Sequence, residues 1–209
     1  VETQKLTASD GVAGDHFGFS VGVSGSTIVV GARNDNIGGN ILQGSVYVFD
    51  RHAGNWVETQ KLTASDGVAV DQFGWSVAVS SSTIVVGAVG HLGRGSVYVF
   101  NREGGSWVET QQLTASDGAA NDLFGLSVAV SGSTIVVGAA FDDINGIIDQ
   151  GSTYVFNREG GSWVETQKLI ASDGALEDHF GFSVAVSGLT IVAGAPEDII
   201  DGKPFQGSA

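Results

Sequence analysis

The chain has 209 residues, including 32 glycines and no cysteine, and a formal net charge of −14. Without cysteine, it can form no disulfide, thiolate metal site or cysteine nucleophile. Nine Lys and Arg residues against 23 Asp and Glu residues disfavour nucleic acids and anionic membrane surfaces as partners, because such binding depends on basic side chains. The longest apolar runs fall far short of the roughly 18 residues that a membrane-spanning helix needs, so we expect no membrane insertion.

One unit is repeated along the whole chain. Val-Glu-Thr-Gln begins at residues 1, 57, 108 and 164, and Phe-Gly at 17, 73, 124 and 180. These positions divide the chain into units of about 1–56, 57–107, 108–163 and 164–209, the last one incomplete. Self-similarity at such a period indicates small units that bury their apolar surfaces against their neighbours.

Each unit contains four strand-like segments in a fixed order. In the second unit they lie at about 73–80, 83–88, 96–101 and 107–115. A short Ser/Gly turn joins the first two, and a Gly-containing turn joins the last two, as in hairpins. Thr-Ile-Val-Val-Gly-Ala suits a strand buried on both faces, whereas the more polar fourth segment suits an outer strand. We therefore expect an all-β fold, a β-propeller of about four tandem four-stranded antiparallel blades.

The repeated motif, seen in Ser116–Ala139 and Gln150–Phe156, resembles the FG-GAP repeat of proteins that include the integrin α-subunit propeller. The resemblance covers essentially the whole chain and implies a single propeller domain over residues 1–209. It also implies an extracellular or cell-surface protein with a binding or adhesion role. Integrin-type repeats carry a calcium loop between the first two strands of a blade. Here a short turn such as Ser80-Ser81-Ser82 takes its place, so those calcium sites are not carried over.

The two ends of the chain fall out of phase with the repeat. The chain begins in an outermost-strand segment and stops at residues 206–209, where a third strand should start. Three arrangements remain open, namely a four-bladed ring, a larger ring shared by two chains, and part of a propeller with more blades. We favour a partial ring or one completed by a homo-oligomer, because exposed sheet edges tend to pair.

Acidic residues concentrate in two kinds of loop at one end of the predicted blades, which we call the loop face. One kind is the Ser-Asp-Gly-x-x-x-Asp segment before the first strand of each unit, and the other is the variable loop after Gly-Ala. Sixteen of the 23 acidic residues lie there, opposed only by Arg33, Arg94 and Lys203. We interpret the residues that recur in every unit as structural, since Asp side chains stabilise turns, with metal binding as the alternative for the Asp residues. The recurrent residues are Asp15, Asp71, Asp122, Asp178, Phe17, Phe73, Phe124 and Phe180.

The variable-loop acids differ between units, and they are the candidate ligand or metal-binding residues. Carboxylates suit Ca²⁺, but the spacing matches no EF-hand, and solvated acidic loops are the alternative interpretation. The blade-two loop has no acid, and we interpret its His91 as isolated. The candidates are Asp35, Asp142, Asp143, Asp149, Glu197, Asp198 and Asp201.

No pairing of a nucleophile with a base is visible in the sequence, so we assign no catalytic residue. We interpret Trp56, Trp107 and Trp163 as packing between blades, and Trp75 as a core residue. The leading hypothesis is a non-enzymatic extracellular binding or adhesion module whose acidic loop face engages a protein or glycan, with Ca²⁺ as a candidate cofactor. The alternatives are a propeller scaffold of a larger polysaccharide-acting enzyme and a purely structural repeat.

Overall fold

The structure is a computed structural model that describes residues 2–209. Its strands form three four-stranded antiparallel sheets, in the orders β1-β2-β3-β4, β5-β6-β7-β8 and β9-β10-β11-β12, and one two-stranded sheet, β13-β14. We call these sheets blades one to four. The strands are β1 (Phe17–Ser24), β2 (Thr27–Ala32), β3 (Ser45–His52), β4 (Asn55–Leu62), β5 (Phe73–Ser80), β6 (Thr83–Ala88), β7 (Ser96–Glu103), β8 (Ser106–Leu113), β9 (Ser127–Ser131), β10 (Thr134–Ala139), β11 (Ser152–Glu159), β12 (Ser162–Leu169), β13 (Ser183–Ser187) and β14 (Thr190–Gly194).

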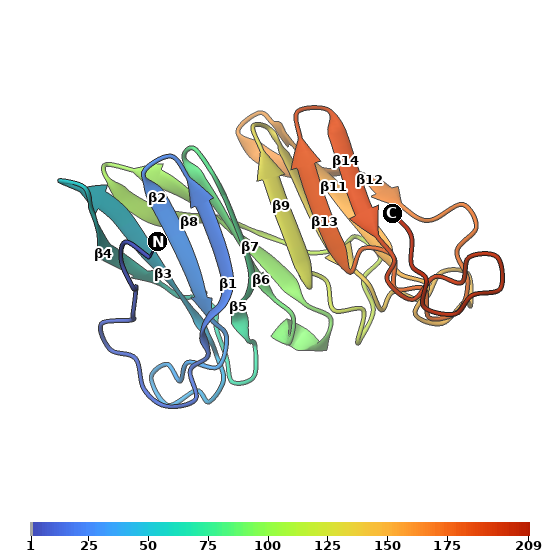
Figure 1. Cartoon of the computed structure of the whole chain (residues 1–209), viewed down its shortest axis with the longest axis horizontal. Coiled ribbons are helices and arrows are strands. Elements are labelled where there is room, and N and C mark those ends of the chain that lie inside the picture. Colours follow the sequence, from blue (N-terminus) through green and yellow to red (C-terminus); the bar gives the residue numbers. More distant parts are fainter. Residues whose placement is uncertain (1) are drawn as a thin grey trace.

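The blades follow one another in an open array rather than a closed ring (Figure 1). Their first strands face each other in sequence, β1 against β5, β5 against β9, and β9 against β13. The predicted all-β fold of tandem antiparallel blades is confirmed, with three blades complete and the fourth reduced to its two inner strands. The described residues contain one short 3₁₀ turn, His91–Gly93, and none of their helical segments could cross a membrane.

The burial of each strand follows from its sequence. The Thr-Ile-Val-Val-Gly-Ala strand β6 is buried along its whole length, because sheet neighbours and adjacent blades cover both of its faces. The outer strand β8 alternates between exposed and more buried residues, as a half-solvated strand should. The third and fourth strands of every complete blade share a register shift, for example between Val48 and Phe49, and such a bulge increases local twist.

The hydrophobic core lies between the blades. Val77 and Val79 of β5 pack on the cluster that contains Val29, Val46 and Val48 of blade one. The same arrangement recurs between blades two and three, where the corresponding valines of β9 pack on blade two. Each blade is therefore stabilised by its neighbours, as expected for a repeat array.

A polar clamp also joins the outer strands of successive blades. Gln60 donates a hydrogen bond to the carbonyl oxygen of Trp107 at 2.7 Å and accepts one from its N–H at 2.8 Å. Gln111 and Trp163 repeat this pairing between blades two and three. Near the N-terminus, Gln4 holds Trp56 in the same way. Residues around Gln4 thus stand where the outer strand of a preceding blade would lie.

The turn before each first strand is built the same way in every blade. In blade two, Asp71 is 1% exposed and accepts a hydrogen bond from the backbone N–H of Val68 at 2.7 Å. The residue between this Asp and the Phe-Gly pair adopts a left-handed backbone in all four copies, which few non-glycine residues do. These residues are His16, Gln72, Leu123 and His179, with φ between 54° and 57°.

Candidate functional site

The loop face of blade one holds a compact network of charged side chains. The ammonium group of Lys61, on the outer strand β4, lies 2.7 Å from a carboxylate oxygen of Asp10 and 2.7 Å from one of Asp35. Asp35 also accepts hydrogen bonds from Ser45 Oγ at 2.6 Å and from the Tyr47 hydroxyl at 3.2 Å. Asp35 is only 5% exposed, so its charge depends on these partners.

The pKa values of this network follow from its contacts. The Lys61 and Tyr47 hydrogen bonds lower the pKa of Asp10. Partial burial disfavours the charged form of Lys61, but the two carboxylates outweigh it and raise the Lys61 pKa. Burial, together with the hydrogen bond to Asp10, raises the pKa of Tyr47 to about 12. Near neutral pH Asp10 is therefore ionised, Lys61 is charged and Tyr47 is protonated.

Blade three repeats the network with equivalent residues. Lys168 lies 2.7 Å from both Asp117 and Asp142, and Tyr154 donates to the same two carboxylates, at 2.7 and 3.1 Å. Ser152 Oγ donates a further short hydrogen bond to Asp142, at 2.5 Å. Two of the candidate metal-binding residues, Asp35 and Asp142, are thus buried and already paired with an ammonium group.

Blade two carries different residues at the positions of this network. His91 replaces the variable-loop Asp, and Gln112 replaces the outer-strand Lys. His91 is 2% exposed, with its ring Nδ1 3.0 Å from Asp71 and its Nε2 3.4 Å from Asp66. The interpretation of His91 as an isolated loop residue was wrong, since it lies buried between two carboxylates. The sequence alone does not show which residues are in contact, so it could not reveal that the short blade-two loop buries this histidine.

The charge of the loop face also needs correction. The sequence suggested that only Arg33, Arg94 and Lys203 oppose the loop acids, but Lys61 and Lys168 reach this face from the ends of the outer strands. Both lysines were missed because they lie 51 residues from Asp10 and Asp117, respectively. The sequence contained one signal of this pairing. A complete blade with Asp in its variable loop has Lys near the end of its outer strand, and the blade with His in that loop has Gln there.

A cavity of about 290 Å³ opens beside the network of blade three. Five carboxylates line it, and Lys168 is the only basic residue among its lining residues. Burial and the nearby charge of Asp142 raise the pKa of Asp122 at its edge, as expected where like charges crowd. The cavity therefore offers a negative environment to a cationic group. Its five carboxylates belong to Asp117, Asp122, Asp142, Asp143 and Asp149.

The remaining candidate acids do not converge on one point. Asp143 accepts a hydrogen bond from the backbone N–H of Asp149 at 2.9 Å and so shapes its own loop. Glu197 lies 3.6 Å from His179, Asp198 is half-buried and Asp201 is exposed. Within residues 2–209, no group of three or more His, Asp or Glu side chains is placed to hold a metal ion.

The recurrent Asp and Phe residues occupy equivalent places in each blade. Asp15, Asp122 and Asp178 are at most 5% exposed and accept the N–H of the residue three positions earlier, as Asp71 does. Phe73 and Phe124 are buried, while Phe17 and Phe180 are half-buried. These contacts are those of turn-stabilising and core residues.

A cation–π stack marks the contact between blades one and two on the same face. The Arg33 guanidinium carbon lies 3.9 Å from the ring centre of Phe19 and 4.3 Å from that of Trp75. Trp75, interpreted from the sequence as core, is half-buried and serves this stack. Trp107 and Trp163 are buried in the inter-blade clusters, in agreement with the prediction that they pack between blades.

Comparison with known families fits this repeated geometry. The model of the FG-GAP repeat matches residues 1–49, 56–100, 107–156 and 163–209. The chain belongs to the FG-GAP repeat family. The second, third and fourth matches each begin in the outer strand of one blade, β4, β8 or β12, and continue into the inner strands of the next blade. One FG-GAP repeat therefore joins the outer strand of one blade to the inner strands of the blade that follows. A search of curated proteins returns no significant match.

Proposed function

We propose that this FG-GAP propeller is a non-catalytic binding module, displayed outside the cell, that uses the loop face of blade three to hold a basic side chain of a protein partner. The observation that carries the proposal is the 290 Å³ cavity with five carboxylates and one lysine. A charged face of this kind attracts a partner of opposite charge and orients it. The cavity can hold a lysine or arginine head group, whereas its carboxylates do not converge on a point as a bound metal ion requires.

Asp143 is the residue to vary. It is exposed, and its one described hydrogen bond is accepted from the backbone N–H of Asp149. In blade one, Asn36 occupies the same place and accepts the equivalent bond from Leu42 at 2.8 Å. Asp143→Asn therefore removes a charge while keeping the hydrogen bond that shapes the loop.

The test is titration of the chain with an oligo-arginine peptide and with an oligo-glutamate peptide at several salt concentrations. We expect saturable binding of the basic peptide alone, weakening with salt. Asp143→Asn should weaken it roughly two- to fivefold, the effect of one partly screened charge. The control is Glu159→Gln, the same charge change at the exposed end of β11. Equal weakening by both variants, or no binding at low salt, would show that the cavity is not the site.

A further inference from the structure

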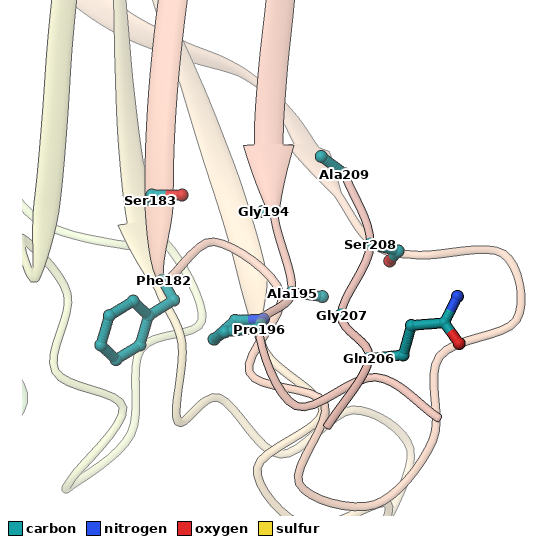
Figure 2. A pocket seen from close by; sticks show the side chains of 9 residues that line it. All are labelled: Phe182, Ser183, Gly194, Ala195, Pro196, Gln206, Gly207, Ser208 and Ala209. Atoms are coloured by element: carbon teal, nitrogen blue, oxygen red, sulfur yellow. The ribbon is translucent and has the colours of Figure 1, made fainter. Parts of the chain in front are cut away.

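A second cavity, of about 490 Å³, lies at the end of blade four (Figure 2). It is lined by residues 182–183 at the start of β13, by 194–196 at the end of β14, and by the C-terminal segment 206–209. Phe182 and Pro196 lie on one side of it, and Gln206 and Ser208 on the other (Figure 2). The proposed binding of basic side chains does not involve this cavity.

The interior blades show what fills the equivalent place. At the contact between blades one and two, the Phe-Gly pair of β5 enters it. The N–H of Phe73 donates to the carbonyl oxygen of Gln43 at 2.8 Å, and Ser20 Oγ donates to the carbonyl oxygen of Gly74 at 2.7 Å. Gly31 lies so close to that Gly74 oxygen that any Cβ would collide with it.

The next two contacts repeat this pattern. Phe124 and Phe180 donate to the backbone carbonyls of Arg94 and Gln150 at 3.0 and 2.9 Å. The serines at the position of Ser20 donate to the Gly carbonyl that follows each Phe, at 2.7 Å in both cases. Three contacts in one chain therefore define a socket that receives a Phe-Gly strand.

Blade four presents the same socket without an occupant from residues 2–209. Gln206 stands at the position of Gln43, Ser183 at that of Ser20, and Gly194 at that of Gly31. A Cβ built on Gly194 approaches Ser183 Oγ of its own blade, but not the backbone of any following blade. The lining is thus already arranged as in the three filled sockets.

The matching Phe-Gly strand is exposed at the other end of the array. A Cβ built on Gly18 of β1 would meet no atom within 4 Å, whereas one on Gly74 would meet the carbonyl oxygen of Ser45 at 2.6 Å. Val21 and Val23 of β1 are each 68% exposed. Their counterparts in β5, Val77 and Val79, pack on blade one.

We infer that β1 of a second copy of this chain docks into the blade-four cavity and associates the copies head to tail. Phe17 N–H of one copy then donates to the carbonyl oxygen of Gln206 of the other, and Ser183 Oγ donates to Gly18. The contact is heterologous, because two different surfaces meet. Blade four offers two strands rather than four, so the contact is smaller than the interior ones, and the association is reversible and concentration-dependent.

Two variants separate the surfaces. We call the exposed surface of β1 the head and the blade-four cavity the tail. Val23→Glu places a charge on the head, and Ser183→Glu places one in the tail, where the serine is exposed. The control is Val164→Glu on the outer strand β12, where the valine is 42% exposed and belongs to neither surface. Circular dichroism establishes that each variant is folded. The mass of each is then measured by analytical ultracentrifugation over a range of concentrations.

We expect the mass of the wild-type chain to rise above the monomer value of 21.4 kDa with concentration. Each end variant should associate about tenfold more weakly or worse, since burying an unpaired charge is unfavourable. The two end variants mixed together should give a dimer and no larger species, because one intact head and one intact tail remain. Val164→Glu should behave as wild type.

Three results would overturn the inference. The first is a wild-type chain that stays monomeric up to its solubility limit. The second is a mixture of the two end variants that forms no dimer, which would exclude a head-to-tail contact. The third is an equal loss of association in Val164→Glu, which would indicate non-specific aggregation.

Discussion

Replacing Lys61 with glutamine tests the charged network of blade one most directly. The change removes the ammonium group that lies 2.7 Å from both Asp10 and Asp35. Asp35 keeps its hydrogen bonds from Ser45 and Tyr47 but loses its neutralising charge. Breaking a fully buried pair costs about 3–5 kcal/mol. The side chains of Lys61 and Asp10 are 26% and 53% exposed, so we expect a smaller loss of about 2 kcal/mol in unfolding free energy.

The assay is urea unfolding followed by tryptophan fluorescence, and the chain supplies its own control. Lys5 occupies the same repeat position as Lys61 but forms no ion pair with another residue of 2–209. Lys5→Gln should therefore change the unfolding free energy little. Adding Asp35→Asn to Lys61→Gln should recover about 1 kcal/mol, because the buried charge is then gone. If the two lysine variants lose equal stability, or if the double variant recovers none, Asp35 does not depend on Lys61.

Other features of the array give further expectations. Gln60→Ala removes both hydrogen bonds to Trp107 and should cost about 1–2 kcal/mol in urea unfolding; an unchanged midpoint would mean that the clamp adds nothing. The folded state lowers the pKa values of Asp10 and Asp117 from 3.8. Their contribution to stability is thus present above that pH and lost as pH falls through the lowered values, so the urea midpoint should drop in acid, and a flat profile would contradict this. His91→Ala empties a buried site and should lower the unfolding free energy by roughly 1–3 kcal/mol, whereas a change below about 0.5 kcal/mol would argue against its packing role.

The fold could be predicted from the sequence because its information is local and repeated. Alternation, apolar runs and Ser/Gly turns occur four times, so each strand is identified by several copies. The second-unit strands β5 and β6 begin and end where the sequence placed them. The last two differ modestly, since β7 extends to Glu103 and β8 runs from Ser106 to Leu113, because a hairpin continues pairing up to its turn.

The candidate site was harder to predict because its contacts join distant parts of the chain. The acidic loops are visible in composition, but their neutralisation by Lys61 and Lys168 depends on how the outer strand ends beside the loop. Whether Asp35 is solvated or buried depends on the side chains of β3, notably Tyr47. Neither fact follows from loop sequence alone.

The left-handed residue before each Phe-Gly pair has a consequence for protein engineering. The four copies carry His, Gln, Leu and His there with nearly the same φ, so the backbone shape is held by its surroundings and tolerates side chains of very different chemistry. Randomising this single position in every blade, for example at Gln72, would diversify four places on one face while leaving the strands untouched. The array is in this sense a display scaffold with one interchangeable residue per blade.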